Sequence, residues 1–190
     1  MITLRCPIWS EHQALVDLRN DNLAYFFSSN RISLEAHLDW YHGVLLDDSQ
    51  EFFVIEADGD LVGTISLMNI DRHHKRAEYG RFLIAEDYRS MGHGKEALTA
   101  LLKYAFGTLS LHKVYGDILN TNVAAITLDE RLGFEQEGIF FDHVWKDGRF
   151  QHVVRMAVFS TSTTAYGSAT NYSTPSLFRL VPTESVLEGA

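Results

Sequence analysis

Hydrophobic positions at strand and helix spacing divide the first fifty residues into three elements. Ile2–Cys6 is a short apolar run that predicts a first strand, and Ser10-x-x-Gln13 resembles a capping box at the start of a helix. The apolar face of that helix is predicted to carry Ala14, Leu15 and Leu18. A second helix is predicted after Ser33, because helical spacing resumes there. Its apolar positions are Leu34, Leu38, Tyr41 and Leu45.

A β-meander is predicted in the middle of the chain. The segments Glu51–Ala57 and Leu61–Met68 are rich in strand-forming residues and are joined across Asp58-Gly59, a strong hairpin signal. Tyr79–Ala85 is predicted as a third strand after the polar connection Asp71–Arg76.

Helical spacing returns after residue 90. The stripe of this third helix consists of Ala97, Leu98, Leu101, Leu102 and Ala105. Lys113–Leu119 is predicted as a strand, and a fourth helix is predicted from Thr121-Asn122 to Leu132-Gly133, where glycine suits the position just after a helix.

The last elements are two strands, Ile139–Trp145 and His152–Phe159, predicted to pair across Asp147-Gly148. The predicted order is β-α-α-β-β-β-α-β-α-β-β. Strands and helices alternate only in the middle, so we predict an α+β (mixed α/β) domain around one sheet, spanning residues 1–159.

Residues 160–190 differ in composition. Twelve of these 31 residues are Ser or Thr, and the apolar positions have no clear period. We predict a flexible tail, with docking of Leu177–Val181 as a short strand or turn as the alternative.

The composition of the 190-residue chain is that of a globular protein with one or two domains. No apolar stretch reaches 18 residues and the first residues lack the pattern of a signal peptide, so we expect a cytoplasmic protein without membrane contact. The single cysteine, Cys6, excludes an internal disulfide and a cysteine-based zinc site. His73-His74 lacks a third ligand nearby, so a solvated loop is preferred and no metal site is predicted.

Charge is distributed unevenly along the chain. The net charge of −9 argues against a nucleic-acid partner. Residues 1–70 carry three basic and 11 acidic side chains, whereas residues 72–95 carry six basic and three acidic ones. The central segment is therefore locally basic, either by chance or because it meets an anion.

A glycine-containing loop lies in this basic segment. Arg89-Ser90-Met91-Gly92-His93-Gly94 has the form R-x-x-G-x-G, directly after a predicted strand and before a predicted helix. Glycines let a ligand approach the backbone, and the unpaired N–H groups of a helix start can hold a phosphate. A Walker A loop is excluded because its first glycine and its final hydroxyl residue are absent. A dinucleotide fingerprint is disfavoured because a three-stranded meander precedes the loop.

With these motifs, residues 1–159 resemble the GNAT superfamily of acetyl-CoA-dependent N-acetyltransferases. The resemblance rests on the order of elements and on two motifs, Arg89-x-x-Gly92-x-Gly94 and Asn122-x-x-Ala125-Ile126-x-Leu128-x-Glu130-x-Leu132-Gly133-Phe134. Ala77–Ile84 resembles the ribosomal-protein-type branch. Leu18-Arg19-Asn20 with Ser33–Leu38 is more similar to the aminosugar-nucleotide acetyltransferases of the pseudaminic acid pathway.

The resemblance implies that acetyl-CoA, as co-substrate, binds in a V-shaped opening between two strands of the sheet. Backbone groups of Phe82, Leu83 and Ile84 would pair with the pantetheine arm, and Asn122 would contact that arm. The residues implied to surround the pyrophosphate are Arg89, Ser90, Met91, Gly92, His93, Gly94 and Lys95. The resemblance also implies a homodimer.

Acetyl transfer requires a neutral amine, because an ammonium has no lone pair. A lysine-like amine is neutral to less than about 0.1% at pH 7, so a carboxylate that accepts its proton is useful. Glu78 is the candidate base; the alternative is that it pairs with Arg81 or Arg19.

The family's usual acid is a tyrosine in the helix of the second motif, but Asp129 stands at that position. The acid therefore stays unassigned. Tyr79, Tyr25 and Tyr41 could replace it or could be packing residues.

The acceptor is predicted to contact Arg19, Asn20 and Tyr41, although the spacing of Tyr41 also suits packing. The subgroup resemblance favours an aminosugar nucleotide. The acidic segment 1–70 favours a cationic acceptor instead, either a polyamine or an N-terminal amine of a protein or peptide. A third possibility is a module that binds CoA without turnover, suggested by Asp129.

Overall fold

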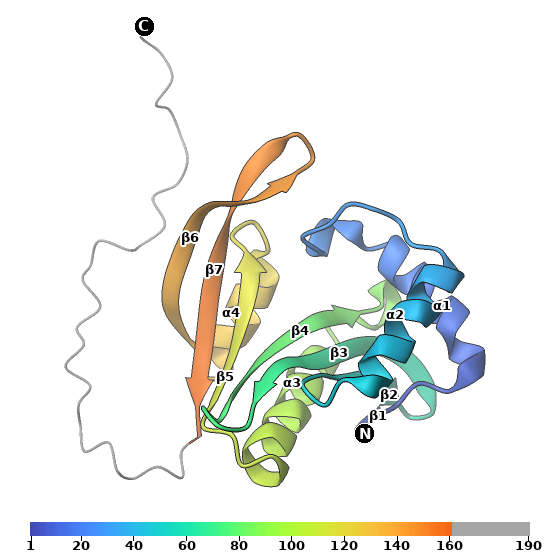
Figure 1. The fold of residues 1–190 in the computed structure, drawn as a ribbon, viewed down its shortest axis with the longest axis horizontal. Helices are drawn as coiled ribbons and strands as arrows, with labels where there is room; N and C mark the ends of the chain where they lie inside the picture. The colour runs from blue at the N-terminus through green and yellow to red at the C-terminus, as the bar shows by residue number, and fades with distance from the viewer. Residues whose placement is uncertain (161–190) are drawn as a thin grey trace, which may run out of the picture. The chain divides into compact units, whose positions relative to one another are not determined.

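The computed structural model describes residues 1–160, which contain a seven-stranded mixed sheet and four helices (Figure 1). The strands are β1 (Ile2–Arg5), β2 (Glu51–Ala57), β3 (Asp60–Asp71), β4 (Arg76–Ile84), β5 (Lys113–Leu119), β6 (Glu135–Lys146) and β7 (Arg149–Phe159). The helices are α1 (His12–Asn20), α2 (Leu34–Leu46), α3 (His93–Lys103) and α4 (Val123–Arg131), and α3 continues into a π-helical turn at Tyr104–Thr108. The predicted order of elements and the α+β class are confirmed.

The strand order is β1-β2-β3-β4-β5-β7-β6, and every pair of neighbours is antiparallel except β4 and β5. Those two parallel strands pair over only three positions, ending at Glu78 opposite Tyr115. Beyond that point β4 runs on beside β3 and β5 runs on beside β7, so the sheet splits (Figure 1).

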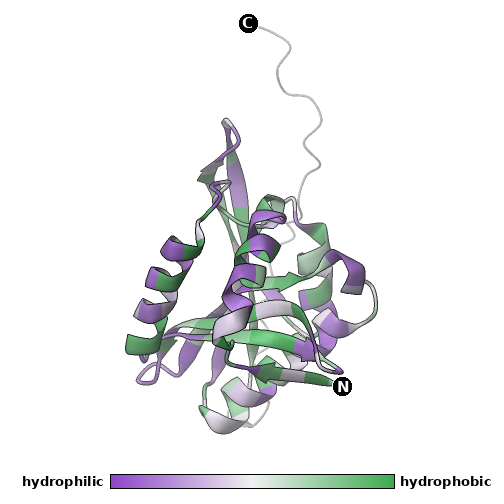
Figure 2. Ribbon diagram, turned by 90° about the vertical axis from the view of Figure 1, so that its right-hand side faces the viewer, coloured by the Kyte–Doolittle hydropathy of each residue, from purple (hydrophilic) through white to green (hydrophobic). Residues whose placement is uncertain are grey.

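Both faces of the first half of the sheet are buried. In β2, Ile55 and Ala57 belong to the large core with α3, whereas Phe52 and Val54 belong to a smaller core with α1 and α2. The period of two in a strand produces this division. Figure 2 shows hydrophobic residues concentrated on the strands, while the helices carry hydrophilic residues along one side.

The predicted start of α1 is wrong. A 3₁₀ turn at Trp9–Glu11 takes the place of the Ser10–Gln13 box, and α1 begins at His12. Ala14 is exposed, and the buried positions are His12, Leu15, Val16 and Asn20.

The predicted start of α2 is confirmed, but its buried face is not. The Ser33 side chain accepts a hydrogen bond from the Ala36 amide at 3.1 Å. Leu45 is 63% exposed, and the fully buried positions are His37 and Val44. Nε2 of His37 lies 3.0 Å from Nδ1 of His12, and this polar contact joins α2 to α1. It explains why the buried face of α2 differs from the predicted apolar face.

The predicted turns are confirmed. Asp58-Gly59 and Asp147-Gly148 join paired strands, and all four residues have positive φ. Gly133 ends α4 with φ of +84°. The predicted tail lies outside the described residues except for Ser160, and no helix within residues 1–160 is long and apolar enough to cross a membrane.

Candidate active site

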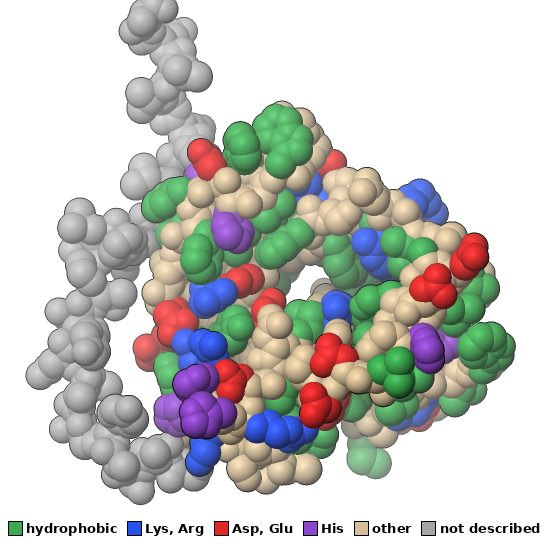
Figure 3. Space-filling view, viewed as in Figure 1, with side chains coloured by type: hydrophobic (Ala, Val, Ile, Leu, Met, Phe, Trp, Pro, Cys, Tyr) green, Lys and Arg blue, Asp and Glu red, His purple; other side chains and the backbone are tan. Residues whose placement is uncertain are grey.

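The parting of β4 and β5 opens a cavity of about 540 Å³. Its walls come from α1, the connection between α1 and α2, α2, and strands β2 to β5. The walls are mostly aromatic and aliphatic, and they include Phe26, Phe27, Trp40 and Phe52. The molecule is visibly hollowed at this place, between the α1–α2 connection and the half of the sheet that contains β6 and β7 (Figure 3).

Glu78 lies in the wall of this cavity, at the last paired position of β4 and β5. Its carboxylate accepts a hydrogen bond from the Asn69 amide group at 2.8 Å. Burial raises the pKa of Glu78, and Asp117 adds to the increase, while the Asn69 hydrogen bond and the more distant Arg155 and Arg81 oppose it. A carboxylate with a raised pKa is a better proton acceptor for an ammonium, which fits the predicted base.

The alternative of an arginine pair is not what the geometry shows, because no ion pair within residues 1–160 includes Glu78. Arg81 instead stacks over the Trp40 ring, 4.7 Å from its centroid, and donates to Gln50 at 3.3 Å. Arg19 stacks over Phe26 at 5.3 Å.

A bulge in β4 turns the strand just after Glu78. Two residues of β4, Arg81 and Phe82, oppose one residue of β3 between the pairs Thr64–Leu83 and Ser66–Gly80. Arg81 has φ of +47°, and its carbonyl accepts a hydrogen bond from the Thr64 hydroxyl at 2.8 Å. Bulges re-aim side chains, and this one coincides with the separation of β4 from β5.

The predicted phosphate loop adopts a conformation that presents backbone amides. Ser90 and Gly92 have φ of +62° and +90°, and Gly92 is the N-cap of α3. The backbone hydrogen bonding of α3 begins with the Glu96 amide on the Gly92 carbonyl at 3.1 Å, so the amides of residues 93–95 precede it. Such a helix start suits a pyrophosphate. Met91 is 63% exposed on the loop, and Lys95 is exposed at the helix start.

Arg89 does not turn its side chain toward these amides. Its Nε donates to the Ile84 carbonyl at 3.0 Å, and its other nitrogens contact the Asn22 side chain and Tyr25. The guanidinium therefore links the loop to the end of β4 and to the α1–α2 connection.

The start of α3 lies directly against the opening of the sheet. A Cβ on Gly94 would lie 3.5 to 3.7 Å from Leu128 of α4 and from Phe82 and Ile84 of β4. The predicted pantetheine strand and the predicted loop are therefore adjacent. Asn122 caps α4, since its side chain accepts from the Ala125 amide at 3.3 Å. The centroid of the His93 ring lies 6.2 Å from the centroid of the Tyr88 ring.

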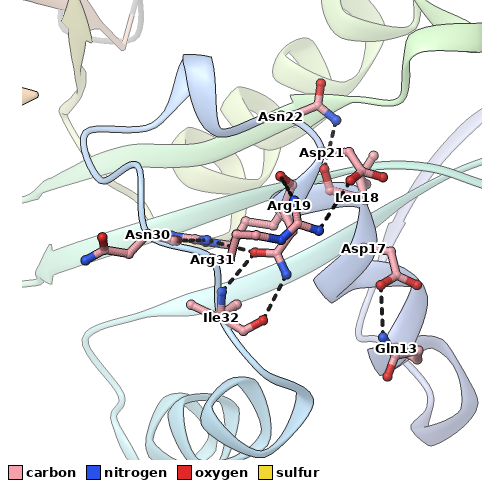
Figure 4. Close-up of polar contacts among 10 residues, drawn as sticks. Gln13, Asp17, Leu18, Arg19, Asp21, Asn22, Asn30, Arg31 and Ile32 are labelled. Atoms are coloured by element: carbon pink, nitrogen blue, oxygen red, sulfur yellow. Dashed lines mark hydrogen bonds and ion pairs between the residues drawn. The ribbon is translucent and has the colours of Figure 1, made fainter. Parts of the chain in front are cut away.

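The predicted acceptor residues have different surroundings. Asn20 is buried, and its side chain exchanges two hydrogen bonds with the backbone of Ile32, at 2.8 and 2.9 Å. Arg19 lines the cavity and donates to the Asn30 carbonyl at 2.9 Å (Figure 4). Tyr41 packs beside Phe52 in the smaller core and is not part of the cavity wall. Direct contact of these three residues with an acceptor stays a prediction, as do the cofactor contacts of the loop.

Sequence reasoning missed the residues that hold the cavity wall in place. Lys146 is only 5% exposed, and its ammonium donates to the Leu23 carbonyl at 2.9 Å and to the Ser29 hydroxyl at 3.0 Å. The Ser29 hydroxyl in turn donates to Asp147 at 2.6 Å. A lysine beside a hairpin turn reads as solvent-exposed in the sequence, so no signal marked it. The aromatic run Tyr25-Phe26-Phe27 was the available signal for the wall.

Comparison with known proteins agrees with this arrangement. The acetyltransferase (GNAT) family matches residues 15–134. The spermidine N(1)-acetyltransferase of Vibrio cholerae is 29% identical over 160 residues, covering 83% of this chain and 92% of the relative. A putative ribosomal N-acetyltransferase, YdaF of Bacillus subtilis, is 31% identical over 137 residues, covering 68% of this chain and 72% of the relative.

Solved structures give the same result. The Vibrio cholerae spermidine N-acetyltransferase in complex with CoA and spermine has a TM-score of 0.78 at 28% identity, covering 83% of this chain and 95% of that one. A dodecameric structure of that enzyme has a TM-score of 0.73 at 28% identity, covering 87% and 98%. The dodecamer belongs to the relative, and the homodimer predicted here stays a prediction.

These relatives support the ribosomal-type branch through one name, and they give no support to the pseudaminic-acid subgroup. The family match covers more than half of the chain, and it spans both the phosphate loop and the second motif. The chain therefore belongs to the GNAT family and is an acetyl-CoA-dependent N-acetyltransferase.

Proposed function

We propose that this enzyme acetylates a primary amine of a linear polyamine such as spermidine. The observation that carries the proposal is the position of Glu78, a carboxylate that forms no ion pair among residues 1–160, in the wall of an otherwise largely aromatic cavity. The names of the relatives from Vibrio cholerae and Escherichia coli, both spermidine N(1)-acetyltransferases, support the same acceptor.

The chemistry of the walls suits such a substrate. A polyamine alternates methylene segments with ammonium groups, so it combines apolar contact with attraction to aromatic faces and to carboxylates. Of the two acidic side chains in the wall, Asp117 accepts two hydrogen bonds from Arg155, at 2.6 and 2.7 Å. Within the described part of the chain, Glu78 accepts only from the neutral amide of Asn69, which makes it the better partner for an ammonium.

The cationic groups of the wall do not form an evident phosphate site. Arg19 and Arg81 each stack on an aromatic ring and donate to groups of the chain itself. Burial, with smaller contributions from His12 and Arg19, lowers the pKa of His37 to about 4, so this wall residue is neutral. A nucleotide diphosphate would need free cations here, and the preferred acceptor is therefore the polyamine rather than the aminosugar nucleotide.

In the proposed reaction the acceptor ammonium gives its proton to Glu78, directly or through water. The neutral amine then attacks the thioester carbonyl of acetyl-CoA, which is held across the opening between β4 and β5. The amine and the thioester react directly in a ternary complex, and the positioning of both substrates supplies much of the acceleration.

The test is an acceptor screen that follows release of free CoA thiol. Spermidine, spermine, a peptide with a free N-terminus and an aminosugar nucleotide are compared at equal concentration with acetyl-CoA. We expect kcat/KM for spermidine to exceed that for the peptide and the sugar nucleotide by at least tenfold. Preferential turnover of the peptide or of the sugar nucleotide would overturn the proposal. Thermal stabilisation by CoA without thiol release from any acceptor would favour a module that only binds CoA.

A further inference from the structure

A buried tyrosine and a buried aspartate meet at the point where β4 and β5 part. Tyr79 directly follows Glu78, the last residue of β4 that pairs with β5, and it lines the cavity while being only 5% exposed. Its hydroxyl donates to Oδ2 of Asp129, on α4, at 2.6 Å. Asp129 is 1% exposed.

The tyrosine ring is fixed by its surroundings. It lies so close to Gly116 of β5 that a Cβ there would be 2.2 Å from the ring, closer than any side chain could approach. The rings of Phe134 and Phe82 contact it edge-on, with centroids 5.5 and 6.4 Å away. The position of the hydroxyl is therefore determined by packing, as a proton donor requires.

Asp129 is poorly accommodated as a carboxylate. Its second oxygen, Oδ1, is buried and has no hydrogen-bond partner among residues 1–160. A buried, unpaired charged oxygen is costly, and protonation removes that cost. Burial raises the pKa of Asp129 to about 7, against the opposing effect of the Tyr79 hydrogen bond, so the neutral acid is well populated at neutral pH.

The other charged groups on the neighbouring elements do not cause this shift. They are Arg76, Glu78 and Arg81 on β4, Lys113 and Asp117 on β5, and Glu130 and Arg131 on α4. The Tyr79 hydroxyl has a pKa raised well above its ordinary value by burial and by Asp129, so it keeps its proton.

Acetyl transfer expels the sulfur of CoA as a thiolate, and a proton delivered to that sulfur disfavours its renewed attack on the carbonyl carbon. In the proposed reaction, Glu78 accepts the proton of the acceptor amine and is therefore not available to protonate the sulfur. Tyr79 is the adjacent residue, it lines the same cavity, and it is joined to a second proton source.

We propose that Tyr79 protonates the departing CoA sulfur and that Asp129 replaces the proton that Tyr79 gives up. As the carbon–sulfur bond of the tetrahedral intermediate breaks, its electron pair goes to sulfur, and sulfur takes the hydroxyl proton of Tyr79. The phenolate oxygen takes the carboxyl proton of Asp129. This leaves a neutral Tyr79 that donates to an Asp129 carboxylate through the hydrogen bond between the two side chains. Because Asp129 is buried, its proton returns through Tyr79 from water that enters the cavity after CoA has left.

The acid that the sequence left unassigned is thereby placed on β4 rather than on α4. Asp129 acts through Tyr79 and is a positioning and proton-supplying residue, whereas Tyr79 is the group that touches the reacting atom.

The experiment compares kcat, KM and the pH profile of the wild type with three variants. Tyr79→Phe keeps the ring and removes the hydroxyl, Asp129→Asn keeps an oxygen that accepts from Tyr79, and Tyr79→Phe/Asp129→Tyr moves the hydroxyl to α4. Tyr104→Phe is the matched control, because Tyr104 also donates to a carboxylate, that of Glu51 at 3.1 Å, but lies outside the cavity wall.

We expect Tyr79→Phe to lower kcat by about 100-fold with the KM for acetyl-CoA within about threefold, a size typical of a lost general acid. The double variant should have a kcat about tenfold higher than that of Tyr79→Phe alone. In the wild type kcat should fall as the pH rises through about 7, because the neutral form of Asp129 is lost, and this limb should be absent in Asp129→Asn.

Any of three results would overturn the proposal. The first is a decrease in kcat for Tyr79→Phe no larger than that for Tyr104→Phe, and the second is a pH profile of Asp129→Asn that keeps the falling limb of the wild type. The third is a double variant that folds and binds CoA but has no higher kcat than Tyr79→Phe. If Tyr79→Phe does not fold, the Asp129→Asn profile decides. Each measurement is made with spermidine, with a primary monoamine that carries a single positive charge, and as acetyl-CoA hydrolysis without amine, since all three release the same thiolate. Failure of spermidine alone therefore counts against the proposed acceptor and not against Tyr79.

Discussion

At the scale of single residues, the carboxylate of Glu78 depends on one close partner. Asn69 donates to it at 2.8 Å, and this hydrogen bond lowers a pKa that burial raises. Asn69 has φ of +50°, a conformation that asparagine and glycine tolerate better than other residues. Glycine at position 69 would therefore remove the donor without adding backbone strain.

Two variants test the base. Glu78→Gln should lower kcat by about 100-fold where Glu78 is ionised in the wild type, and by less at lower pH, because the wild-type side chain is then also protonated and cannot accept the proton. Asn69→Gly should keep most of the maximal rate but move the rising limb of the pH profile to higher pH. The carboxylate of Glu78 loses a hydrogen bond that favours its charged form, so its pKa rises. Steady-state rates between about pH 5 and pH 9 check both expectations. A Glu78→Gln variant with the wild-type rate throughout would exclude Glu78 as the base.

Gly92 and Gly94 have different physical roles in the phosphate loop. Gly92 requires its φ of +90° and has open space around it, whereas a Cβ on Gly94 would make ordinary contacts with residues on both sides of the opening. Gly92→Ala should therefore destabilise the fold by about 1–3 kcal/mol through backbone strain. Gly94→Leu should leave unfolding nearly unchanged but weaken CoA binding by at least tenfold, because the added side chain would crowd the predicted pyrophosphate site.

Thermal unfolding with and without CoA separates the two effects, and calorimetric titration gives the affinity. Gly94→Ala is the control, because its Cβ would lie 3.5 Å or more from its neighbours. Unweakened CoA binding by Gly94→Leu would place the cofactor away from the start of α3.

Single residues were predictable where their role is local. The glycines of the loop follow from the backbone conformations that a strand-to-helix turn requires. The aromatic wall and Lys146 were not predictable as a site, because Lys146 contacts residues more than a hundred positions away, and only the folded chain brings them together.

At the scale of elements, two helix caps allow a direct test of the predicted cofactor contact of Asn122. Asn122 caps α4 beside the opening, and Ser33 caps α2, which supplies part of the proposed acceptor cavity. Asn122→Ala and Ser33→Ala should each lower the free energy of unfolding by about 1 kcal/mol, the usual effect of a lost N-cap.

Only Asn122→Ala should also weaken CoA binding, and Asn122→Ser should restore the cap without restoring the amide. Chemical denaturation and CoA titration of the four proteins, including the wild type, separate capping from cofactor contact. Equal CoA affinity in all four would show that Asn122 serves the helix alone.

The strands, turns and helix order were predictable because each depends on neighbouring residues, such as Asp58-Gly59 in the first hairpin. The buried faces of α1 and α2 were not, because apolar spacing alone omitted the polar contact between His12 and His37. A face that buries two histidines does not appear in a count of hydrophobic positions.

At the scale of the whole molecule, the site results from the topology of the sheet. β4 and β5 are the one parallel pair within residues 1–160, and each strand has another partner that draws it away after three residues. The resemblance implied this opening, but nothing in the alternation of hydrophobic residues predicts where two parallel strands separate. The sequence did show that the segment 1–70, which supplies α1, α2 and much of the cavity wall, is strongly acidic.

This charge distribution leads to a prediction about ionic strength. A net charge of −9 attracts a polycation at long range. Salt reduces the range of that attraction, because the Debye length falls from about 30 Å at 0.01 M to about 3 Å at 1 M. Raising the salt concentration from about 0.02 to 0.5 M should therefore lower kcat/KM for spermidine several-fold, mainly through KM, because we expect this proposed trivalent acceptor to be recognised partly by charge. A primary monoamine of similar length, which carries one positive charge instead of three, is the control, and its kcat/KM should change by less than about twofold. Equal salt effects on the two amines would instead locate the salt dependence in acetyl-CoA binding at the basic segment 72–95, and would leave the acidic segment without a role in acceptor capture.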